Sequence, residues 1–448
     1  MYYIILIFSL IVLTIATYKI FNKDIVAPSF IVCITYLAST VAAYGAKIFN
    51  LWNYVELKPL TCIIIIIGVI SFILGEFVTR KIMLKFIKKS KKRKVKEKEN
   101  NKIIKVDKIK FTIICVFLIS TLFVIVYQMQ KITGINDNIP KMINAYREKT
   151  PLFNNTEEAT SINTFAMQMY RASELFAYFF IFIIINNILL KDKIKDNLIY
   201  LIPIIISIII TFFVAGRSAF IRMIYATMFV GLILYRKINN KKLNEKKVIK
   251  IIGISAVILL PIFYLIMPLI GRTQETNIGN YVTFYLGSPI PSFNEVIEKK
   301  QSYETIFLEK ETFKEIQSIL NKFKLYDTYT PYQNEWINFK GLYSNVFSGV
   351  KTYYFDFGMI GVIIFQMLFG STVCIIYKMF LYKNKKIYGL IFAFFVSYML
   401  IDQYRTEKLF STIFSLDSII YIVYMVIILN FFLINKKNME NYIKGVRK

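Results

Sequence analysis

The sequence predicts an all-α, polytopic integral membrane protein, and three observations support this. Of the 448 residues, 56% are hydrophobic, and long apolar runs recur from one end of the chain to the other. Most of these runs reach the roughly 20 residues that a helix needs to cross a bilayer. Only 10 prolines interrupt them. Because a spanning helix satisfies its own backbone groups, we expect these runs to be transmembrane helices.

We expect about 11 transmembrane helices. The apolar runs lie at 2–20, 25–44, 60–79, 111–130, 173–190, 198–215, 218–235, 251–270, 358–377, 387–401 and 418–435. The weakest are 25–44, which contains Pro28 and Ser29, and the short run 387–401. The N-terminus lacks the basic residues and the cleavage site of a signal peptide, so 2–20 is expected to be a retained first helix.

The net charge of +28 predicts how the helices are oriented. If the loop 80–110 is cytoplasmic and the sides then alternate, the inside segments hold 36 Lys and Arg against eight Asp and Glu. Essentially the whole net charge then lies on one side, as the positive-inside rule requires. The N-terminus is then outside and the C-terminus cytoplasmic. A membrane surface accounts for the basic loops, so nucleic acid is rejected as a partner.

We expect a single membrane domain over 1–448, with three long segments outside the helices. These are a basic cytoplasmic loop at 80–110, an outer loop at 131–172 and a large extracytoplasmic loop at 272–355. Apolar residues recur at helical spacing in Tyr303–Tyr326, which predicts an amphipathic helix along the membrane or over a cavity. Long loops in compact proteins are usually functional, so a lid over the outer face is expected here.

Arg217 lies in the middle of the apolar tract 198–235. The tract is about twice as long as one span, so it must fold as two spans joined at Gly216, Arg217 and Ser218. An ionisable group at such a place is a functional-site hypothesis by default. The alternative is an arginine whose guanidinium simply extends to the interface.

Four further arginines lie at predicted outer helix ends: Arg171, Arg222, Arg272 and Arg405. Arginine suits a diphosphate, because its planar and permanently charged guanidinium bonds oxygens bidentately. A cluster of them would suit a lipid whose diphosphate lies at headgroup level. Extension to the interface is again the alternative for each. That alternative is favoured for Arg222, which lies roughly 140° around a helix from Arg217.

Carboxylates are the candidate general bases, because the chain contains no histidine. Asp356 and Asp402 are the two catalytic candidates, and Glu174 and Glu295 are others. Each could instead cap a helix or pair with a neighbouring arginine. The four cysteines all fall inside apolar runs, so no disulfide framework or metal site is indicated.

Five short motifs follow one another along the chain. They are Asp24-Ile-Val-Ala-Pro28-Ser, Ala215-Gly216-Arg217-Ser218, Tyr285-Leu-Gly-Ser-Pro289, Tyr354-Phe-Asp356-Phe-Gly358-Met-Ile-Gly361 and Tyr404-Arg405. In order and architecture the set resembles the Wzy-like polymerases of O-antigen and capsular oligosaccharide repeat units, which also carry a large extracytoplasmic loop late in the chain. The likeness covers most of the chain.

The resemblance implies a GT-C-like fold in the bacterial cytoplasmic (inner) membrane. It implies a glycosyltransferase, without cofactor or metal, that transfers a growing glycan from undecaprenyl diphosphate to the next lipid-linked repeat unit on the outer face. Arg217 would bind diphosphate, where helix N-terminal amides add positive field, and Arg272 and Arg405 would hold the diphosphate or the glycan. Some relatives use histidines here, and their absence moves the base to Asp356 or Asp402.

The resemblance also implies partners: undecaprenyl-diphosphate-linked oligosaccharide, membrane lipids, a flippase and a chain-length regulator. Two other functions stay open. An O-antigen-type ligase shares the architecture and attaches a finished chain to another acceptor. A flippase or transporter of lipid-linked oligosaccharide needs polar groups along a path through the bilayer. The predicted spans are poor in polar residues at mid-depth, which favours chemistry at the surface.

Overall fold

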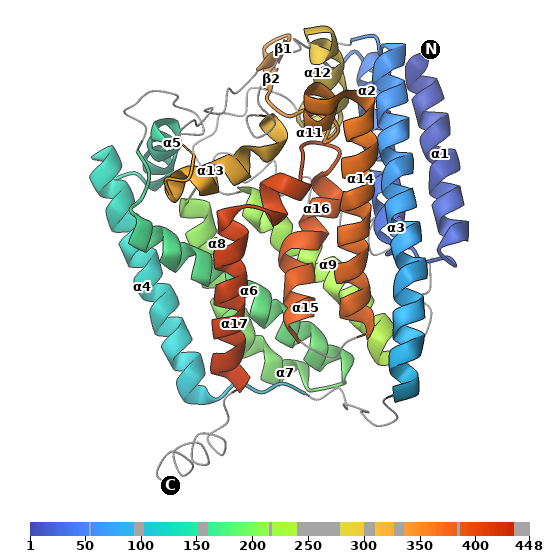
Figure 1. Cartoon of the computed structure of the whole chain (residues 1–448). Coiled ribbons are helices and arrows are strands. Elements are labelled where there is room, and N and C mark those ends of the chain that lie inside the picture. Colours follow the sequence, from blue (N-terminus) through green and yellow to red (C-terminus); the bar gives the residue numbers. More distant parts are fainter. Residues whose placement is uncertain are drawn as a thin grey trace. The chain divides into compact units, whose positions relative to one another are not determined.

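The chain is a mostly helical, multi-pass membrane protein (Figure 1). The computed structural model describes residues 1–52, 55–93, 103–150, 160–214, 217–239, 278–299, 310–326, 336–382 and 386–433. Within these residues, eight helices are long and apolar enough to cross a bilayer: Tyr2–Ile20, Pro28–Ile48, Pro59–Met83, Lys108–Thr133, Thr164–Leu189, Ile194–Phe213, Ala219–Ile238 and Lys351–Tyr382. The predicted helical membrane fold is therefore confirmed. The predicted span 251–270 lies outside the described residues.

Contacts between the helices divide the chain into two compact units. Unit 1 comprises Met1–Lys98, Glu275–Tyr382 and Phe395–Ser418, and unit 2 comprises Glu99–Gln274, Lys383–Phe394 and Ile419–Lys448. The membrane domain predicted over 1–448 is thus divided internally, and each unit combines segments that are far apart in the sequence.

Four long helices form the frame of unit 1. They are α1 (Tyr2–Ile20), α2 (Pro28–Ile48), α3 (Pro59–Arg93) and α14 (Lys351–Tyr382). Helix α2 begins at Pro28, later than the predicted residue 25, because proline is well suited to the first helical position, where its missing N–H is not needed.

Helices α3 and α14 make the most extensive contact in unit 1. Gly75 of α3 faces the Met367 carbonyl, and Gly370 of α14 faces the Phe72 carbonyl, so a Cβ on either glycine would collide with backbone. The rings of Phe72 and Phe369 meet edge to face beside them, with centroids 5.4 Å apart. Small residues at such a crossing let two membrane helices approach closely.

Helix α14 is interrupted at Gly358, whose φ of 64° and ψ of −155° are not helical. This backbone conformation is essentially open only to glycine. The helix begins at Lys351, before the predicted span 358–377. Because of the interruption at Gly358, it changes direction where that span was expected to start.

The predicted outer loop 272–355 contains short elements of unit 1. They are α11 (Ile278–Gly287), α12 (Pro289–Val296), η3 (Ile297–Lys299), η5 (Glu311–Phe313), α13 (Lys314–Lys322), β1 (Ile337–Phe339) and β2 (Leu342–Ser344). The amphipathic helix predicted at Tyr303–Tyr326 is confirmed over Glu311–Lys322 by η5 and α13. The strands form an antiparallel hairpin, which is the only β-sheet within the described ranges.

Part of this loop enters the helical frame. Figure 1 shows α11 and α12 beside one end of α2. Ser39 of α2 donates to the Leu286 carbonyl at 2.8 Å, and Gly287 packs on the backbone of Ala43. The chain then returns, and Asn294 accepts a 2.8 Å hydrogen bond from the Lys58 amide just before α3. The α11–α12 pair therefore packs against α2 and the start of α3.

Unit 2 has its own helical core. Its elements are α4 (Lys108–Thr133), α5 (Ile139–Lys149), α6 (Thr164–Leu189), α7 (Ile194–Asn197), η1 (Leu198–Tyr200), α8 (Leu201–Phe213), α9 (Arg217–Asn239), α15 (Lys386–Ile391) and most of α17 (Leu416–Leu433). Helix α6 is central and packs on α4, α8 and α9. The Ser207 hydroxyl of α8 donates to the Ser173 carbonyl of α6 at 2.9 Å.

The predicted span 387–401 is composite. It consists of α15, the π-helical turn η6 (Phe392–Val396) and α16 (Ser397–Asp402). A second π-helical turn, η7 (Leu409–Ile413), precedes α17. Such turns interrupt the regular hydrogen-bond pattern of an α-helix and are frequent at functional sites.

Candidate active site

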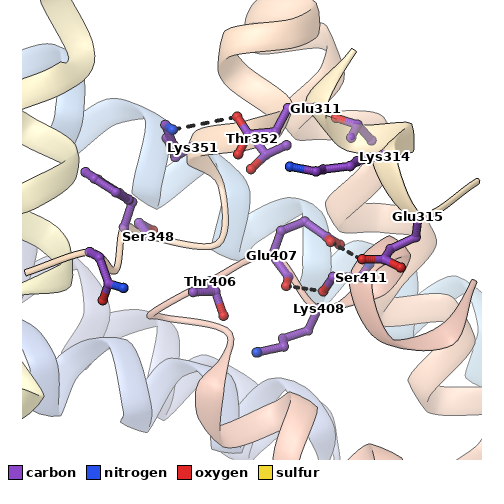
Figure 2. Close-up of a pocket in the computed structure, with 13 residues that line it drawn as sticks. Glu311, Lys314, Glu315, Ser348, Lys351, Thr352, Thr406, Glu407, Lys408 and Ser411 are labelled. Atoms are coloured by element: carbon purple, nitrogen blue, oxygen red, sulfur yellow. Dashed lines mark hydrogen bonds and ion pairs between the residues drawn. The ribbon is translucent and has the colours of Figure 1, made fainter. Parts of the chain in front are cut away.

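Unit 1 contains a polar cavity of about 390 Å³ (Figure 2). Three segments that are distant in the sequence line it, at 311–315, 345–352 and 406–411. Its charged and hydroxyl-bearing residues are Glu311, Thr312, Lys314, Glu315, Ser348, Lys351, Thr352, Thr406, Glu407, Lys408 and Ser411. Closely spaced hydrogen-bond donors and acceptors, with charges of both signs among them, suit a ligand rich in hydroxyl groups.

Ser348, which lines the cavity, lies beside the candidate membrane-spanning helix α2. A Cβ on Gly68 of α3 would lie 2.7 Å from Val350 Cγ1, and Gly68 is about 14 Å along the helix from Pro59. The Tyr36 hydroxyl of α2 is 3.2 Å from Ser348 Oγ and donates to the Gln403 carbonyl at 3.4 Å. The cavity segment 345–352 is therefore packed against α2 and α3, well inside the ends of both helices.

Glu407 organises one wall of the cavity. Its Oε1 accepts hydrogen bonds from the Tyr353 hydroxyl at 2.6 Å and the Phe410 amide at 2.8 Å. Its Oε2 accepts from the Ser411 amide at 2.9 Å. The carboxylate thus caps the first turn of η7 and links that turn to α14. Hydrogen bonds within the protein therefore occupy both of its oxygens.

Lys351 and Glu311 form an ion pair at another wall. Lys351 Nζ lies 3.6 Å from Glu311 Oε2. It also lies 4.8 Å from the ring centre of Phe347 and 5.1 Å from that of Phe355. The two rings and the carboxylate stabilise the ammonium group at the start of α14.

Asp402 lies between two cations. Arg405 Nη1 donates to Asp402 Oδ1 at 3.1 Å, and Lys408 Nζ lies 3.0 Å from Asp402 Oδ2. Burial alone would lower the pKa of Lys408, but Tyr398 and Asp402 outweigh it and raise that pKa above its usual value. The predicted catalytic residue Asp402 is therefore engaged on both oxygens, as the carboxylate that holds Arg405 and Lys408.

Arg405, a predicted diphosphate or glycan ligand, is next to the cavity. Its guanidinium carbon lies 4.6 Å from the ring centre of Tyr285 in α11. Its Nε is buried without a hydrogen-bond partner among the described residues. Tyr285 of α11 therefore contacts the guanidinium, and the motifs at Tyr285 and Arg405 meet in space.

Asp356, the other predicted base, anchors the segment that carries α13. Its Oδ2 accepts hydrogen bonds from the Thr312 amide and the Thr312 hydroxyl, both at 2.6 Å. Thr312 lines the cavity, whereas Asp356 does not. The position of Asp356 fits the helix-cap alternative, since it satisfies a backbone amide of η5.

Lys314 and Glu315 extend from the first turn of α13 toward the cavity (Figure 2). Burial lowers the pKa of Lys314 to about 8, although Glu311 and Glu315 act in the opposite direction. Burial and the negative charge of Asp417 raise the pKa of Glu315 above that of an ordinary glutamate. Shifted groups in a cleft are typical of proton-transfer sites.

Arg171 and Arg222 belong to α6 and α9 of unit 2. Arg222 Nη2 donates to Glu174 Oε1 at 2.9 Å, and the Tyr421 hydroxyl donates to Glu174 Oε2 at 2.7 Å. Glu174 is completely buried. The arrangement matches the ion-pair alternative for Arg222 and Glu174, and diphosphate binding by Arg171 and Arg222 stays a prediction.

Arg217 is the first residue of α9, and α8 ends at Phe213. The tract 198–235 is therefore two helices, as predicted. Arg272 lies outside the described residues. Of the five predicted arginines, the structure places Arg405 beside the cavity of unit 1.

Sequence reasoning missed the residues that carry most of the cavity's charge: Glu311, Lys314, Glu315, Lys351, Glu407 and Lys408. A usable signal was present. Charged residues are dense at 310–315 and at 402–408, and the second stretch lies between two apolar runs.

A second buried charge cluster lies at the opposite end of α3. The Ser29 amide and hydroxyl both donate to Glu76 Oε2 at 2.6 Å. Arg80 Nε donates to Glu76 Oε1 at 2.7 Å, and the Tyr377 hydroxyl donates to Asp24 at 3.0 Å. The motif at 24–29 is thus used to join α1, α2, α3 and α14.

Carboxylates and amines are the groups of the cavity that could transfer a proton, because the chain has no histidine. Within the described ranges, no group of three or more Cys, Asp or Glu side chains is placed to hold a metal ion. Comparison with protein-family models, with curated proteins and with solved structures found no match for this chain.

Proposed function

We propose that this protein polymerises lipid-linked oligosaccharide repeat units at the outer face of a bacterial cytoplasmic membrane. It transfers the growing glycan from undecaprenyl diphosphate to the next undecaprenyl-diphosphate-linked unit. About 11 spans carry the chain, with the N-terminus outside and the cytoplasmic side marked by the basic segments. The proposal includes a flippase that supplies the substrate and a chain-length regulator that limits the product.

The observation that carries the proposal is the polar cavity of unit 1, whose segment 345–352 packs against the candidate spanning helices α2 and α3. A lipid-linked sugar has an apolar tail within the bilayer and a hydroxyl-rich head at its boundary. A cavity that is built against α2 and α3, and whose walls carry carboxylates, amines and hydroxyls, matches that division. Ionisable groups next to spanning helices are functional-site hypotheses by default.

The charges also match the reaction. The acceptor sugar loses a hydroxyl proton, which requires a base, and the donor releases a diphosphate, which requires cations. The cavity and its rim provide both, because Glu311, Glu315 and Lys314 line it and Arg405 lies next to it. Arginine and lysine can stabilise the diphosphate as its negative charge develops.

The test is a polymerisation assay with the purified full-length protein in lipid nanodiscs and undecaprenyl-diphosphate-linked repeat units. The expected product is a ladder of glycans that differ by one repeat unit. A single transfer to a different acceptor would identify a ligase. Movement of the lipid-linked unit across a vesicle membrane, with no lengthening of the glycan, would identify a flippase.

Arg217 gives the matching variant test of the diphosphate site. Arg217→Ala is expected to abolish the ladder, because removal of a transition-state cation costs about 10²–10³ in turnover. Arg236→Ala, near the other end of the same helix, is the control for expression and insertion. Polymer of wild-type length from Arg217→Ala would remove Arg217 from the site.

A further inference from the structure

The carboxylates around the cavity differ in what already occupies their oxygens. Glu407 accepts three hydrogen bonds, and Asp402 is held by Arg405 and Lys408. A general base needs a lone pair that can reach the acceptor's hydroxyl hydrogen. Glu407 and Asp402 therefore have no oxygen lone pair left open to receive that hydrogen.

The same reasoning applies to Glu311 and Asp356. Glu311 is paired with Lys351. Asp356 holds the Thr312 amide and hydroxyl, and it does not line the cavity. These two carboxylates hold the segment 311–315 in place relative to α14, which is a structural task.

Glu315 is different. It lines the cavity, it is half-buried, and it has no hydrogen bond or ion pair to another residue within the described part of the chain. It is carried by the first turn of α13, which the anchors at Glu311 and Thr312 fix against α14. A carboxylate held by its backbone but left open at its oxygens is suited to receive a proton from a ligand.

We propose that Glu315 is the catalytic base, which accepts the proton of the acceptor sugar's hydroxyl in this cavity. The inference rests on the proposed function. The O–H bond breaks and its proton passes to a Glu315 oxygen. The hydroxyl oxygen forms a bond to the anomeric carbon of the donor glycan. The bond from that carbon to the diphosphate oxygen breaks, its electron pair stays with undecaprenyl diphosphate, and Glu315 then releases the proton to water.

Neighbouring charges favour this step. Lys314 and Lys408 lie on the same cavity, where positive charge stabilises the departing diphosphate. The raised pKa of Glu315 makes it a stronger base than an exposed glutamate once it is ionised. Because only the ionised carboxylate acts as a base, the rate should rise with pH as Glu315 loses its proton.

The experiment compares Glu315→Gln and Glu315→Asp with wild type in the nanodisc assay, over pH 4 to 9. Glu315→Gln removes no hydrogen bond, so it is expected to fold with a wild-type unfolding temperature and to lose at least about 100-fold in turnover. Glu315→Asp is expected to keep measurable turnover and to shift the acid limb of the pH profile. Glu298→Gln is the matched control, since Glu298 is exposed and pairs with Lys58.

The outcomes separate the two claims. If the wild-type protein polymerises and the turnover of Glu315→Gln is within about threefold of the wild-type turnover, the role of Glu315 is overturned and the polymerase function stands. Wild type that produces no ladder would refute the polymerase function and the role of Glu315 with it. If Glu315→Gln fails to fold, the pH profile of Glu315→Asp decides the matter. An acid limb at the same pH as in the wild-type protein overturns the inference, and a shifted acid limb supports it.

Discussion

The Tyr353 hydroxyl donates a 2.6 Å hydrogen bond to Glu407 Oε1, and this bond joins the first turn of α14 to the residue that caps η7. Tyr353 is fully buried. Because Glu407 also accepts the amides of Phe410 and Ser411, one carboxylate holds two elements together at the edge of the polar cavity.

Tyr353→Phe is expected to lower the free energy of unfolding by about 1.5–3 kcal/mol, since it removes a buried hydrogen bond to a charged group. Thermal unfolding in detergent measures the change. Tyr343→Phe is the control, because Tyr343 is largely exposed on β2. Equal stability of the two variants would mean that the Tyr353–Glu407 bond contributes nothing.

Asp402→Asn tests whether Asp402 is a base or a positioning residue. Loss of the carboxylate leaves the charges of Arg405 and Lys408 close together and largely buried, and breaking a buried pair in this way costs about 3–5 kcal/mol. We expect the unfolding temperature to fall sharply and Lys408→Met to restore part of it in the double variant. Wild-type stability combined with lost turnover would instead assign Asp402 to the chemistry.

The lowered pKa of Lys314 predicts a dependence of stability on pH. The folded protein releases the Lys314 proton near pH 8, whereas the unfolded chain keeps it to about 10.4. Between these values the unfolded state binds more protons, so stability rises with pH. At pH 7 the charged amine destabilises the fold, and Lys314→Met is expected to stabilise it by about 1 kcal/mol after solvent screening.

This gain should shrink as pH rises from 8 to 10, because wild-type Lys314 becomes neutral there. Chemical unfolding of both proteins at pH 7, 8, 9 and 10 measures it. A difference between the two proteins that stays constant over this range would contradict the prediction. Lys322→Met, on an exposed position of the same helix, is the control.

The paired glycines of α3 and α14 predict a packing effect. Gly75→Ala and Gly370→Ala each place a methyl group against a carbonyl of the other helix, and such overpacking costs about 1–3 kcal/mol. Gly231→Ala of α9 is the control, since its nearest neighbour would be Ile185 at 4.0 Å. It should be neutral or stabilising, because alanine favours helix. Unchanged unfolding temperatures for the Gly75 and Gly370 variants would refute the close crossing.

The orientation of the membrane domain is tested by cysteine labelling in a chain without its four native cysteines. Tyr343 is well exposed on the hairpin β1–β2. Tyr343→Cys should react in intact cells with a membrane-impermeant maleimide. Lys195→Cys, on the exposed α7, should react only after lysis. The reverse pattern would invert the predicted topology.

Much of the helical frame could be predicted from apolar runs. The run 2–20 corresponds to α1 at Tyr2–Ile20, and 198–235 divides into α8 and α9. The α11–α12 pair was not predicted, because its helices of 10 and 8 residues are too short to form a long apolar run. Hydrophobicity also could not reveal that η6 interrupts the run 387–401, because a π-helical turn depends on how neighbouring helices pack.

The site was predictable only in part. Arg405 and Asp402 were identified because charges at the end of an apolar run are conspicuous. Glu315 and Glu407 were not, because their roles depend on contacts over long sequence separations. Tyr353 and Glu407 are 54 residues apart in the sequence. No local pattern distinguishes a carboxylate that caps η7 from one that is open to a cavity.

The contacts at Gln403 have a consequence for biogenesis. Gln366 lies within the span Lys351–Tyr382, and its side-chain oxygen accepts from the side-chain amide of Gln403. The Tyr36 hydroxyl, in an earlier span, donates to the Gln403 carbonyl. While the chain emerges from the ribosome, Tyr36 enters the bilayer long before Gln403 has been made. The nascent protein must shelter its hydroxyl, so ribosomes that stall before residue 403 should leave an insertion intermediate prone to quality-control proteolysis.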